Sequence, residues 1–131
     1  QVVDWFNCPY EAGQTDTTYV AIVGDGTAWP GATGATYEDF ARDGMAGTIH
    51  LVETHNSCIH WMEPRDLDFA TMATTINQGP PGRCISSHHG AGATVAMADC
   101  SVHFLPDTIS GKTVQSLVTI EGGEIVNPDD F

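Results

Sequence analysis

Alternation of apolar and polar residues is clearest over residues 93–105, ATVAMADCSVHFL. Two such runs joined by a short polar turn predict a β-hairpin. A two-residue turn at Asp99-Cys100 would connect the two strands, although such turns favour Asp-Gly because both central residues need a positive φ. In this register four apolar side chains share one face and are expected in the core: Val95, Met97, Val102 and Phe104.

Shorter patterns predict the remaining elements. β-Branched and aromatic runs indicate strands at 18–23, 47–53, 58–62 and 84–87, and an edge strand at 124–126. Helical spacing indicates one turn at 37–41, a short helix at 69–76 capped by Asp66 or Asp68, and a helix at 111–120 capped by Ser110. In the strand at 47–53, Ile49 and Leu51 are expected to share one apolar face. These elements predict a single α+β domain over residues 1–131, an antiparallel sheet with short helices.

Charge excludes two classes of partner. The chain of 131 residues carries 4 Lys+Arg against 17 Asp+Glu, a formal net charge of -13. Binding to nucleic acid or to an anionic membrane surface depends on basic side chains, so neither partner is expected. No apolar run approaches the ~20 residues that span a bilayer, and the first residues lack the basic and apolar regions of a signal peptide. We therefore expect no membrane contact by this sequence.

The four cysteines, Cys8, Cys58, Cys84 and Cys100, lie far apart and form no C-x-x-C pair. An even number in an acidic chain predicts two disulfides and an oxidising compartment, extracellular or at the cell surface. Three pairings exist. We favour Cys58 with Cys84, because each begins a predicted strand, and Cys8 with Cys100. The alternative is four unrelated buried thiols.

The hairpin also carries a family resemblance. Residues 89–104, HGAGATVAMADCSVHF, resemble the signature H-P-G-G-A-N-x-x-F-A-D-G-S-V-x-F of a large family of bacterial pilin-like surface proteins. Segments at 19–31, 43–53, 59–67 and 122–126, and the pair Cys8-Pro9, resemble further motifs of that family in the same order. The chain departs from the signature at four positions: Gly90 stands for Pro, Thr94 for Asn, Met97 for Phe and Cys100 for Gly.

The resemblance implies a cell-surface or extracellular subunit with a pilin-like antiparallel sheet that self-associates into a filament or appendage. It supplies no catalytic residues. The family's N-terminal half, with its long apolar helix, has no counterpart in this sequence, so assembly by strand addition at an exposed edge stays open. Cys100, in place of the family's turn glycine, is interpreted as a staple that ties the hairpin tip to the segment around Cys8.

Histidines suggest a possible chemical site. His88, His89 and His103 would converge if the loop at 88–92 folds back on the hairpin, and with Glu53 or Glu63 they would suit zinc or copper. No H-E-x-x-H motif supports this, and the alternative is that His89 only holds the glycine-rich loop. Glu53 and Glu63 also have the residue type of a glycosidase acid and base, although buried carboxylates are more often paired structurally.

Calcium and glycan binding form the remaining alternative. Asp25, Asp39 and Asp43 lie near glycine-rich turns and offer the oxygen ligands that Ca²⁺ prefers, but aspartates also serve turns by bonding their own backbone. Trp29, before a proline, is the best candidate for an exposed sugar platform. The leading hypothesis is an extracellular assembly subunit without a required cofactor, the alternative is a secreted glycan- or calcium-binding module, and no enzyme is expected because no nucleophile motif such as G-x-S-x-G occurs.

Overall fold

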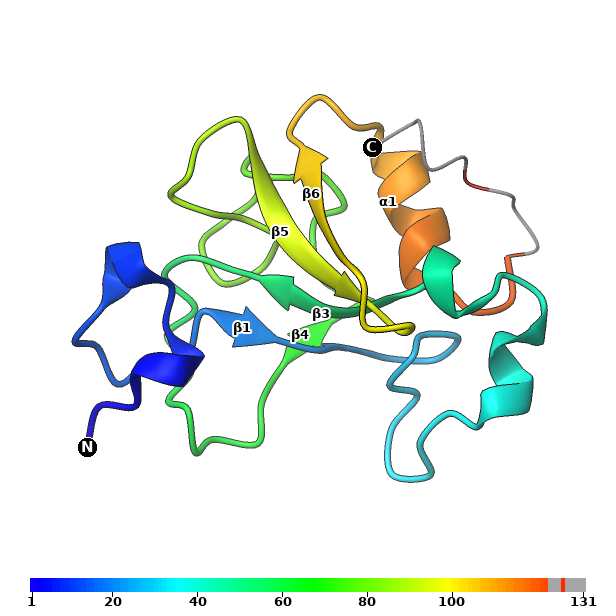
Figure 1. Ribbon diagram of the computed structural model, residues 1–131, viewed down its shortest axis with the longest axis horizontal. Coiled ribbons are helices and arrows are strands. Elements are labelled where there is room, and N and C mark those ends of the chain that lie inside the picture. Colours follow the sequence, from blue (N-terminus) through cyan, green and yellow to red (C-terminus); the bar gives the residue numbers. More distant parts are fainter. Residues whose placement is uncertain (123–125, 127–131) are drawn as a thin grey trace.

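A four-stranded antiparallel sheet in the order β1-β3-β5-β6 forms the centre of the protein (Figure 1). The structure, a computed structural model, describes residues 1–122 and residue 126. The sheet is built from β1 (Tyr19–Val20), β3 (Ile49–Glu53), β5 (Gly92–Met97) and β6 (Val102–Pro106). A parallel pair, β2 (Ile22–Val23) and β4 (Leu67–Asp68), stands beside it. The α+β class expected from the sequence is confirmed.

The helical elements are short. The described residues contain one α-helix, α1 (Gly111–Val118), and four 3-10 turns, η1 (Asp4–Phe6), η2 (Pro9–Glu11), η3 (Tyr37–Ala41) and η4 (Met45–Gly47). The turn expected at 37–41 and the Ser110 cap are confirmed, since the Ser110 hydroxyl accepts the Thr113 N–H at 3.0 Å. The helix stops before residue 120 because the Ile120 N–H bonds the Gly26 carbonyl instead.

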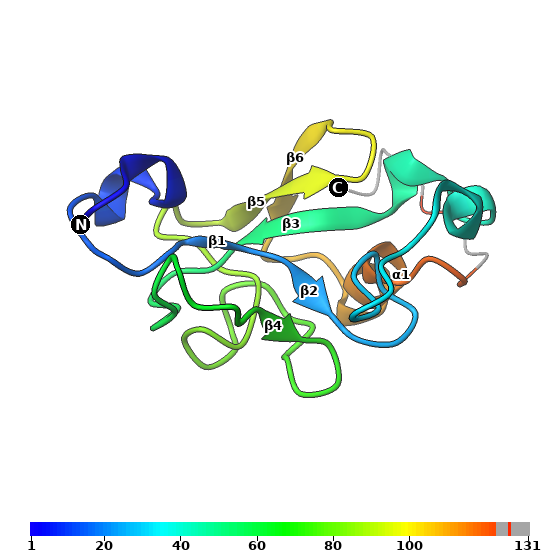
Figure 2. The same ribbon diagram turned by 90° about the horizontal axis from the view of Figure 1, so that it is seen from below.

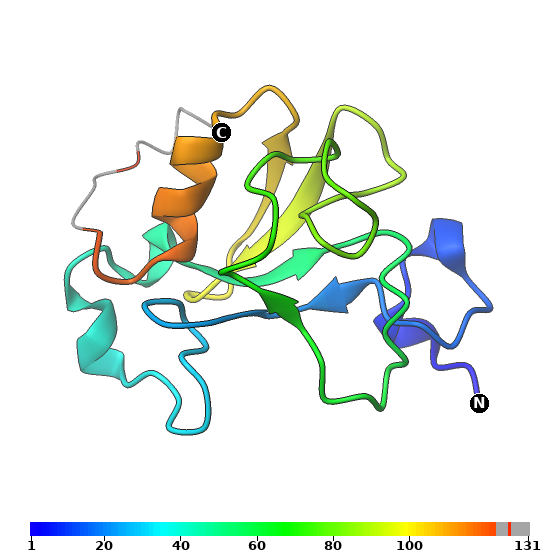
Figure 3. The ribbon, with the colours of Figure 1, turned by 180° about the vertical axis from the view of Figure 1, so that it is seen from behind.

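One side of the sheet, the inner face, is covered. In Figure 2, α1, β2 and β4 lie below the strands of the main sheet, and Figure 3 shows the chain between β3 and β5 crossing on that same side. Val114, Leu117 and Val118 of α1 are buried there. They pack in one core with Val20, Ile49, Val52, Ala93, Val95, Met97 and Leu105 of the sheet.

The hairpin forms where the pattern predicts it, but its register is shifted by one residue. Met97 donates to the Ser101 carbonyl, and Val95 lies opposite His103, so the loop has three residues, Ala98 to Cys100. Such loops end in a residue with left-handed backbone, and Cys100 has φ +70°. A slip of one residue turns every side chain of one strand over. Val102 and Phe104, expected in the core, are therefore exposed.

A β-bulge changes the faces of β3. Ile49 lies opposite Met97 and Leu51 lies opposite Ala96, so β3 advances two residues while β5 advances one. Ile49 points into the core, whereas Leu51 is 40% exposed on the other side. The expectation that Ile49 and Leu51 share a face is wrong.

The region between β3 and β5 contains less regular structure than expected. The helix at 69–76 does not form, because the N–H groups of Ala73 and Asn77 bond the carbonyls of Arg83 and Ile85 on a neighbouring segment. The strands expected at 58–62 and 84–87 are reduced to the isolated bridges Asp16–His60 and Ala73–Cys84. Met72 and Ile76 are nevertheless buried, as their spacing predicts. The edge strand expected at 124–126 falls outside the described residues.

Candidate functional site

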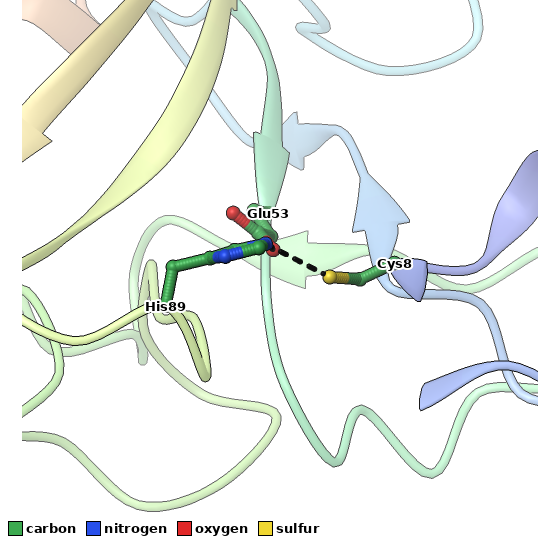
Figure 4. Close-up of side chains that lie close together, drawn as sticks. All are labelled: Cys8, Glu53 and His89. Atoms are coloured by element: carbon green, nitrogen blue, oxygen red, sulfur yellow. Dashed lines mark hydrogen bonds and ion pairs between the residues drawn. The ribbon is translucent and has the colours of Figure 1, made fainter. Parts of the chain in front are cut away.

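Three side chains with metal-ligand chemistry meet at the end of β3: Cys8, Glu53 and His89 (Figure 4). Their donor atoms all lie within 4.8 Å of one another. The Cys8 Sγ is 3.2 Å from the His89 Nε2, and that nitrogen is 3.9 Å from the Glu53 Oε1. Among the described residues this is the one group of three or more such side chains at this spacing.

Each side chain comes from a different part of the chain. Cys8 precedes η2, and its N–H donates to the Thr18 Oγ1 at 2.6 Å, which attaches the N-terminal segment to the start of β1. Glu53 ends β3, and its Oε2 accepts the Thr94 N–H of β5 at 3.2 Å. The other carboxylate oxygen of Glu53, Oε1, is the one that faces His89.

His89 is held by a tight loop. Its N–H donates to the Ser87 Oγ at 3.1 Å, and the next two residues, Gly90 and Ala91, adopt positive φ values of +68° and +59°. The His89 and Tyr10 rings pack edge to face, with their centroids 4.8 Å apart. These two residues reverse the direction of the chain before β5, and the His89 imidazole lies beside Cys8.

The site buries negative groups. Glu53 is 3% exposed and Glu11, at the end of η2, is 6% exposed. The ion-pair partners that the structure records for these two carboxylates are both histidines, His89 for Glu53 and His88 for Glu11, the latter at 3.0 Å. The four Lys and Arg side chains are all exposed, and Arg65 pairs with Glu63. Burying a carboxylate without a cation is costly, so this region favours a positive charge.

The Cys8 thiol is not activated as a nucleophile. Burial raises its pKa, and the carboxylates of Glu53 and Glu11 oppose the thiolate further. A catalytic Cys–His–carboxylate triad also needs the carboxylate and the thiol at opposite nitrogens of the imidazole. Here both groups approach the same Nε2, so the arrangement is one of three donors facing a common point.

The three predicted histidines do not converge. His89 joins the cluster and His88 lies beside it, paired with Glu11 and packed on the His55 ring with centroids 4.7 Å apart. His103 lies on β6, where its Nε2 is 3.1 Å from the Ser101 Oγ. Glu53 takes part as anticipated, whereas Glu63 pairs with Arg65.

Two of the aspartates expected to bind calcium accept hydrogen bonds from the backbone. Asp39 accepts the N–H and hydroxyl of Thr36 in a capping box, and these bonds lower its pKa. Asp43 accepts the Gly122 N–H at 3.0 Å. With Asp25, they do not form a cluster of donor atoms within the described part of the chain.

Trp29 is only partly available to a ligand. Its indole N–H donates to the His50 carbonyl at 2.8 Å, and its ring packs on the His50 ring with centroids 4.5 Å apart. It is 37% exposed, whereas Trp5 is 90% exposed. The arrangement anchors the loop after β2 to β3, so no structural feature favours Trp29 as a sugar platform.

The disulfide expectation is not met, because all four cysteines are free in the structure. Cys8 lies at the Glu53 end of β3, whereas the hairpin tip bonds Met45 and Thr48 before the other end. β3 alone separates these ends by about 13 Å at the usual rise per residue, too far for a bridge between Cys8 and Cys100. Cys58 is exposed, whereas Cys84 is buried with its sulfur on the Pro80 carbonyl at 3.7 Å.

The even number of cysteines predicts a bridge for Cys8, and no sequence feature predicts a role for Glu11. The signal for Cys8 was present in the motifs, because Cys8, Glu53 and His89 each stand in a segment that resembles the family pattern. Glu11 has no comparable signal. Its burial follows from the η2 turn, which begins at Pro9 as expected for a proline at the start of a helical turn.

Together these features define a small α+β domain with a mixed Cys/Glu/His cluster at one end of its sheet. A family model, SBP_bac_10, described as a protein of unknown function (DUF1559), matches residues 13–112, and the chain belongs to this family. The family is one of bacterial surface proteins. No curated protein and no solved structure matches the chain. Among the described residues no helix combines the length and apolar character needed to cross a bilayer.

Proposed function

We propose that this protein is an extracellular structural subunit that self-associates through the open face of its four-stranded sheet. The membership in a family of bacterial surface proteins and the resemblance to pilin-like precursors support a place at the cell surface. The partner in this proposal is a second copy of the same chain. The observation that carries it is the composition of the face opposite α1, which we call the outer face.

The outer face is apolar and exposed. Cross-strand register aligns Leu51, Ala96 and Val102 in one row and Thr94 with Phe104 in the next. Leu51 is 40%, Phe104 48% and Val102 66% exposed. In Figure 2 the N-terminal turns η1 and η2 lie on this side near β1, whereas no helix or strand of the described residues lies over β5 and β6. A contiguous exposed apolar patch on a small domain marks an interaction surface.

Charge favours a second copy on this face. The chain has a net charge of -13, so two copies repel each other over most of their surfaces. The exposed side chains of the outer face, Tyr19, Leu51, Val102 and Phe104, carry no charge, and neither do the half-buried Thr94 and Ala96 between them. Glu53, which pairs with Tyr19 on this face, is buried. The face is therefore where two copies approach with the least repulsion and remove the most apolar surface from water.

Strand β6 adds an open edge to this face. It is the last strand of the sheet, paired only with β5 in the described order. Natural edge strands are usually protected by charges or bulges. β6 has the sequence VHFLP, with no acidic residue or lysine, and proline stands only at its end. An edge of this kind can contribute backbone hydrogen bonds to a contact with a second copy.

The test is a comparison of two glutamate variants at exposed apolar positions. Phe104→Glu puts a charge in the outer face, whereas Met62→Glu puts the same charge at a residue that is 69% exposed and lies outside the sheet. Sedimentation and light scattering over a concentration series should show assembly of the wild type and of Met62→Glu. Phe104→Glu should remain largely monomeric over the same range, with a dissociation constant for self-association at least tenfold higher than that of the wild type.

Electron microscopy of the assembled wild type then distinguishes filaments from closed oligomers. A wild type that remains monomeric at millimolar concentration would overturn the proposal. So would assembly that Phe104→Glu leaves unchanged while circular dichroism shows an intact fold, because the outer face would then not be the contact.

A further inference from the structure

We propose that Cys8, Glu53 and His89 bind a single zinc ion, with water as the fourth ligand. The donors are the Cys8 Sγ, the Glu53 Oε1 and the His89 Nε2. This proposal does not rest on self-association, because its three ligands are not among the exposed side chains of the outer face. Binding forms a zinc–sulfur bond, and the proton of the Cys8 thiol leaves to solvent.

The distances fit a tetrahedral ion. Usual zinc bond lengths place a sulfur and a nitrogen ligand about 3.6 Å apart, and a nitrogen and an oxygen ligand about 3.4 Å apart. The structure has 3.2 Å between the Cys8 Sγ and the His89 Nε2, and 3.9 Å between that nitrogen and the Glu53 Oε1. The third pair, the Cys8 Sγ and a Glu53 carboxylate oxygen, lies within 4.8 Å, against about 3.6 Å around a zinc ion. Side-chain shifts of about 1 Å or less would therefore complete the site.

The donor types select the metal. A thiolate excludes calcium and magnesium, which take oxygen ligands, whereas thiolate, imidazole and carboxylate are all usual ligands of Zn²⁺. Three protein ligands leave one tetrahedral position open. His89 is the exposed member of the set, with 41% of its side chain accessible, so the open position faces solvent beside His89 rather than the core.

The surroundings hold two of the ligands in place before metal arrives. Thr94 N–H holds the Glu53 Oε2, which leaves Oε1 free to turn to the ion. The loop around His89 is fixed by the Ser87 hydroxyl. Hydrogen bonds that orient a ligand in this way are a regular part of protein metal sites.

Charge also favours an ion at this point. Glu53 and Glu11 are both more than nine-tenths buried, and the ion-pair partner recorded for the Glu11 Oε1 is the His88 Nε2, at 3.0 Å. A divalent cation would balance the Glu53 carboxylate and the Cys8 thiolate and lower the cost of burying Glu11 nearby. The expected consequence is structural, since zinc would join residues 81 positions apart in the chain.

The experiment uses reduced, metal-free protein and two probes, Zn²⁺ by calorimetry and Co²⁺ by absorption spectroscopy. The wild type should bind one equivalent, and Co²⁺ should give a thiolate charge-transfer band in the near ultraviolet. Cys8→Ser should lose this band. Cys58→Ser, which removes an exposed cysteine, should keep it. Glu53→Gln, whose amide oxygen can still accept from Thr94, should bind at least tenfold more weakly.

If Cys8→Ser does not fold, a measurement on the wild type alone still tests the proposal. Alkylation of each cysteine is followed by mass spectrometry with and without Zn²⁺. Zinc should slow modification of Cys8 at least tenfold and leave Cys58 and Cys100 unchanged. Equal modification of Cys8 in both conditions, or Zn²⁺ binding that Glu53→Gln and Cys8→Ser leave unaltered, would overturn the proposal. Phe104→Glu should bind zinc normally, so a failure of self-association would not affect this result.

Discussion

Replacement of Cys100 by glycine should stabilise the protein. Cys100 closes the three-residue hairpin loop with φ +70°, and its side chain is exposed, so the substitution removes little packing. A residue with a Cβ in left-handed backbone costs roughly 1–2 kcal/mol, which glycine avoids. Glycine also adds about 0.4–1 kcal/mol of entropy to the unfolded chain, which opposes the gain. The net expected increase in the free energy of unfolding is about 0.5–1 kcal/mol.

Two further variants isolate the cause. Cys100→Ala removes the thiol but keeps the Cβ, so it should have nearly the stability of the wild type. Asp99→Gly distinguishes the two possible loops. A two-residue turn would need positive φ at both Asp99 and Cys100, and glycine would then help at either position. In the structure Asp99 has no positive φ, and its Oδ1 accepts the N–H and hydroxyl of Ser101, so Asp99→Gly should destabilise the protein.

The assay is urea unfolding under reducing conditions, followed by circular dichroism and fluorescence so that two probes test for a single transition. For a domain of 131 residues, a gain of 1 kcal/mol corresponds to a rise of about 3–5 °C in Tm. If Cys100→Gly were less stable than Cys100→Ala, the left-handed assignment at Cys100 would be wrong. If Asp99→Gly were stabilising, the register of the whole hairpin would be wrong, and Val102 and Phe104 would return to the core.

Three other outcomes follow from the structure. Gly92→Ala should destabilise by about 3 kcal/mol in the same unfolding assay, because a Cβ there would lie 2.2 Å from the Leu105 carbonyl oxygen, whereas Gly47→Ala, with nothing within 4 Å, should change little. Leu117→Ala should cost about 2–5 kcal/mol, since Leu117 is fully buried between α1 and the sheet, and a loss below 1 kcal/mol would contradict this packing. Burial lowers the pKa of His50, so the folded protein binds fewer protons than the unfolded chain just below pH 6.5. The contribution of His50 to stability should therefore fall as the pH falls through this value, and NMR titration of its ring should give a pKa below 6.5.

Elements with a strong local signal could be predicted from the sequence. The α1 helix has its cap at Ser110 and its buried stripe at Val114, Leu117 and Val118, both determined within one segment. The 3-10 turn at 37–41 likewise follows from local chemistry, the capping box of Thr36 and Asp39. The segment at 69–76 shows the limit of this reasoning. Its burial was predicted correctly, but its backbone hydrogen bonds go to a segment that local pattern cannot identify.

Faces of strands depend on register, which local pattern does not determine. One additional loop residue turns β6 over, and one additional bulge residue separates Ile49 from Leu51. Both differences from the predicted register move apolar side chains from the core to the surface. Leu51, Val102 and Phe104 were expected in the core because they are apolar, and the structure exposes them together. The residues that local pattern misplaces are the ones that form the outer face, which makes that face the strongest indication of what the protein contacts.

Part of the Cys8, Glu53 and His89 cluster could be predicted from the sequence. The residue types of Glu53 and His89 suit a metal and predict a shared site, whereas the even number of cysteines predicts disulfides and so favours a bridge for Cys8. Cysteine number alone does not distinguish a thiol in a bridge from a thiol at a metal, since both uses need a cysteine brought close to a distant segment. The position of Cys8 along β3 makes the distinction. At the Glu53 end the thiol meets a buried carboxylate and an imidazole, and the hairpin tip with Cys100 lies beyond the other end. A bridge would require the N-terminal segment to leave Thr18, whereas a zinc ion requires only small side-chain movements within the contacts already present.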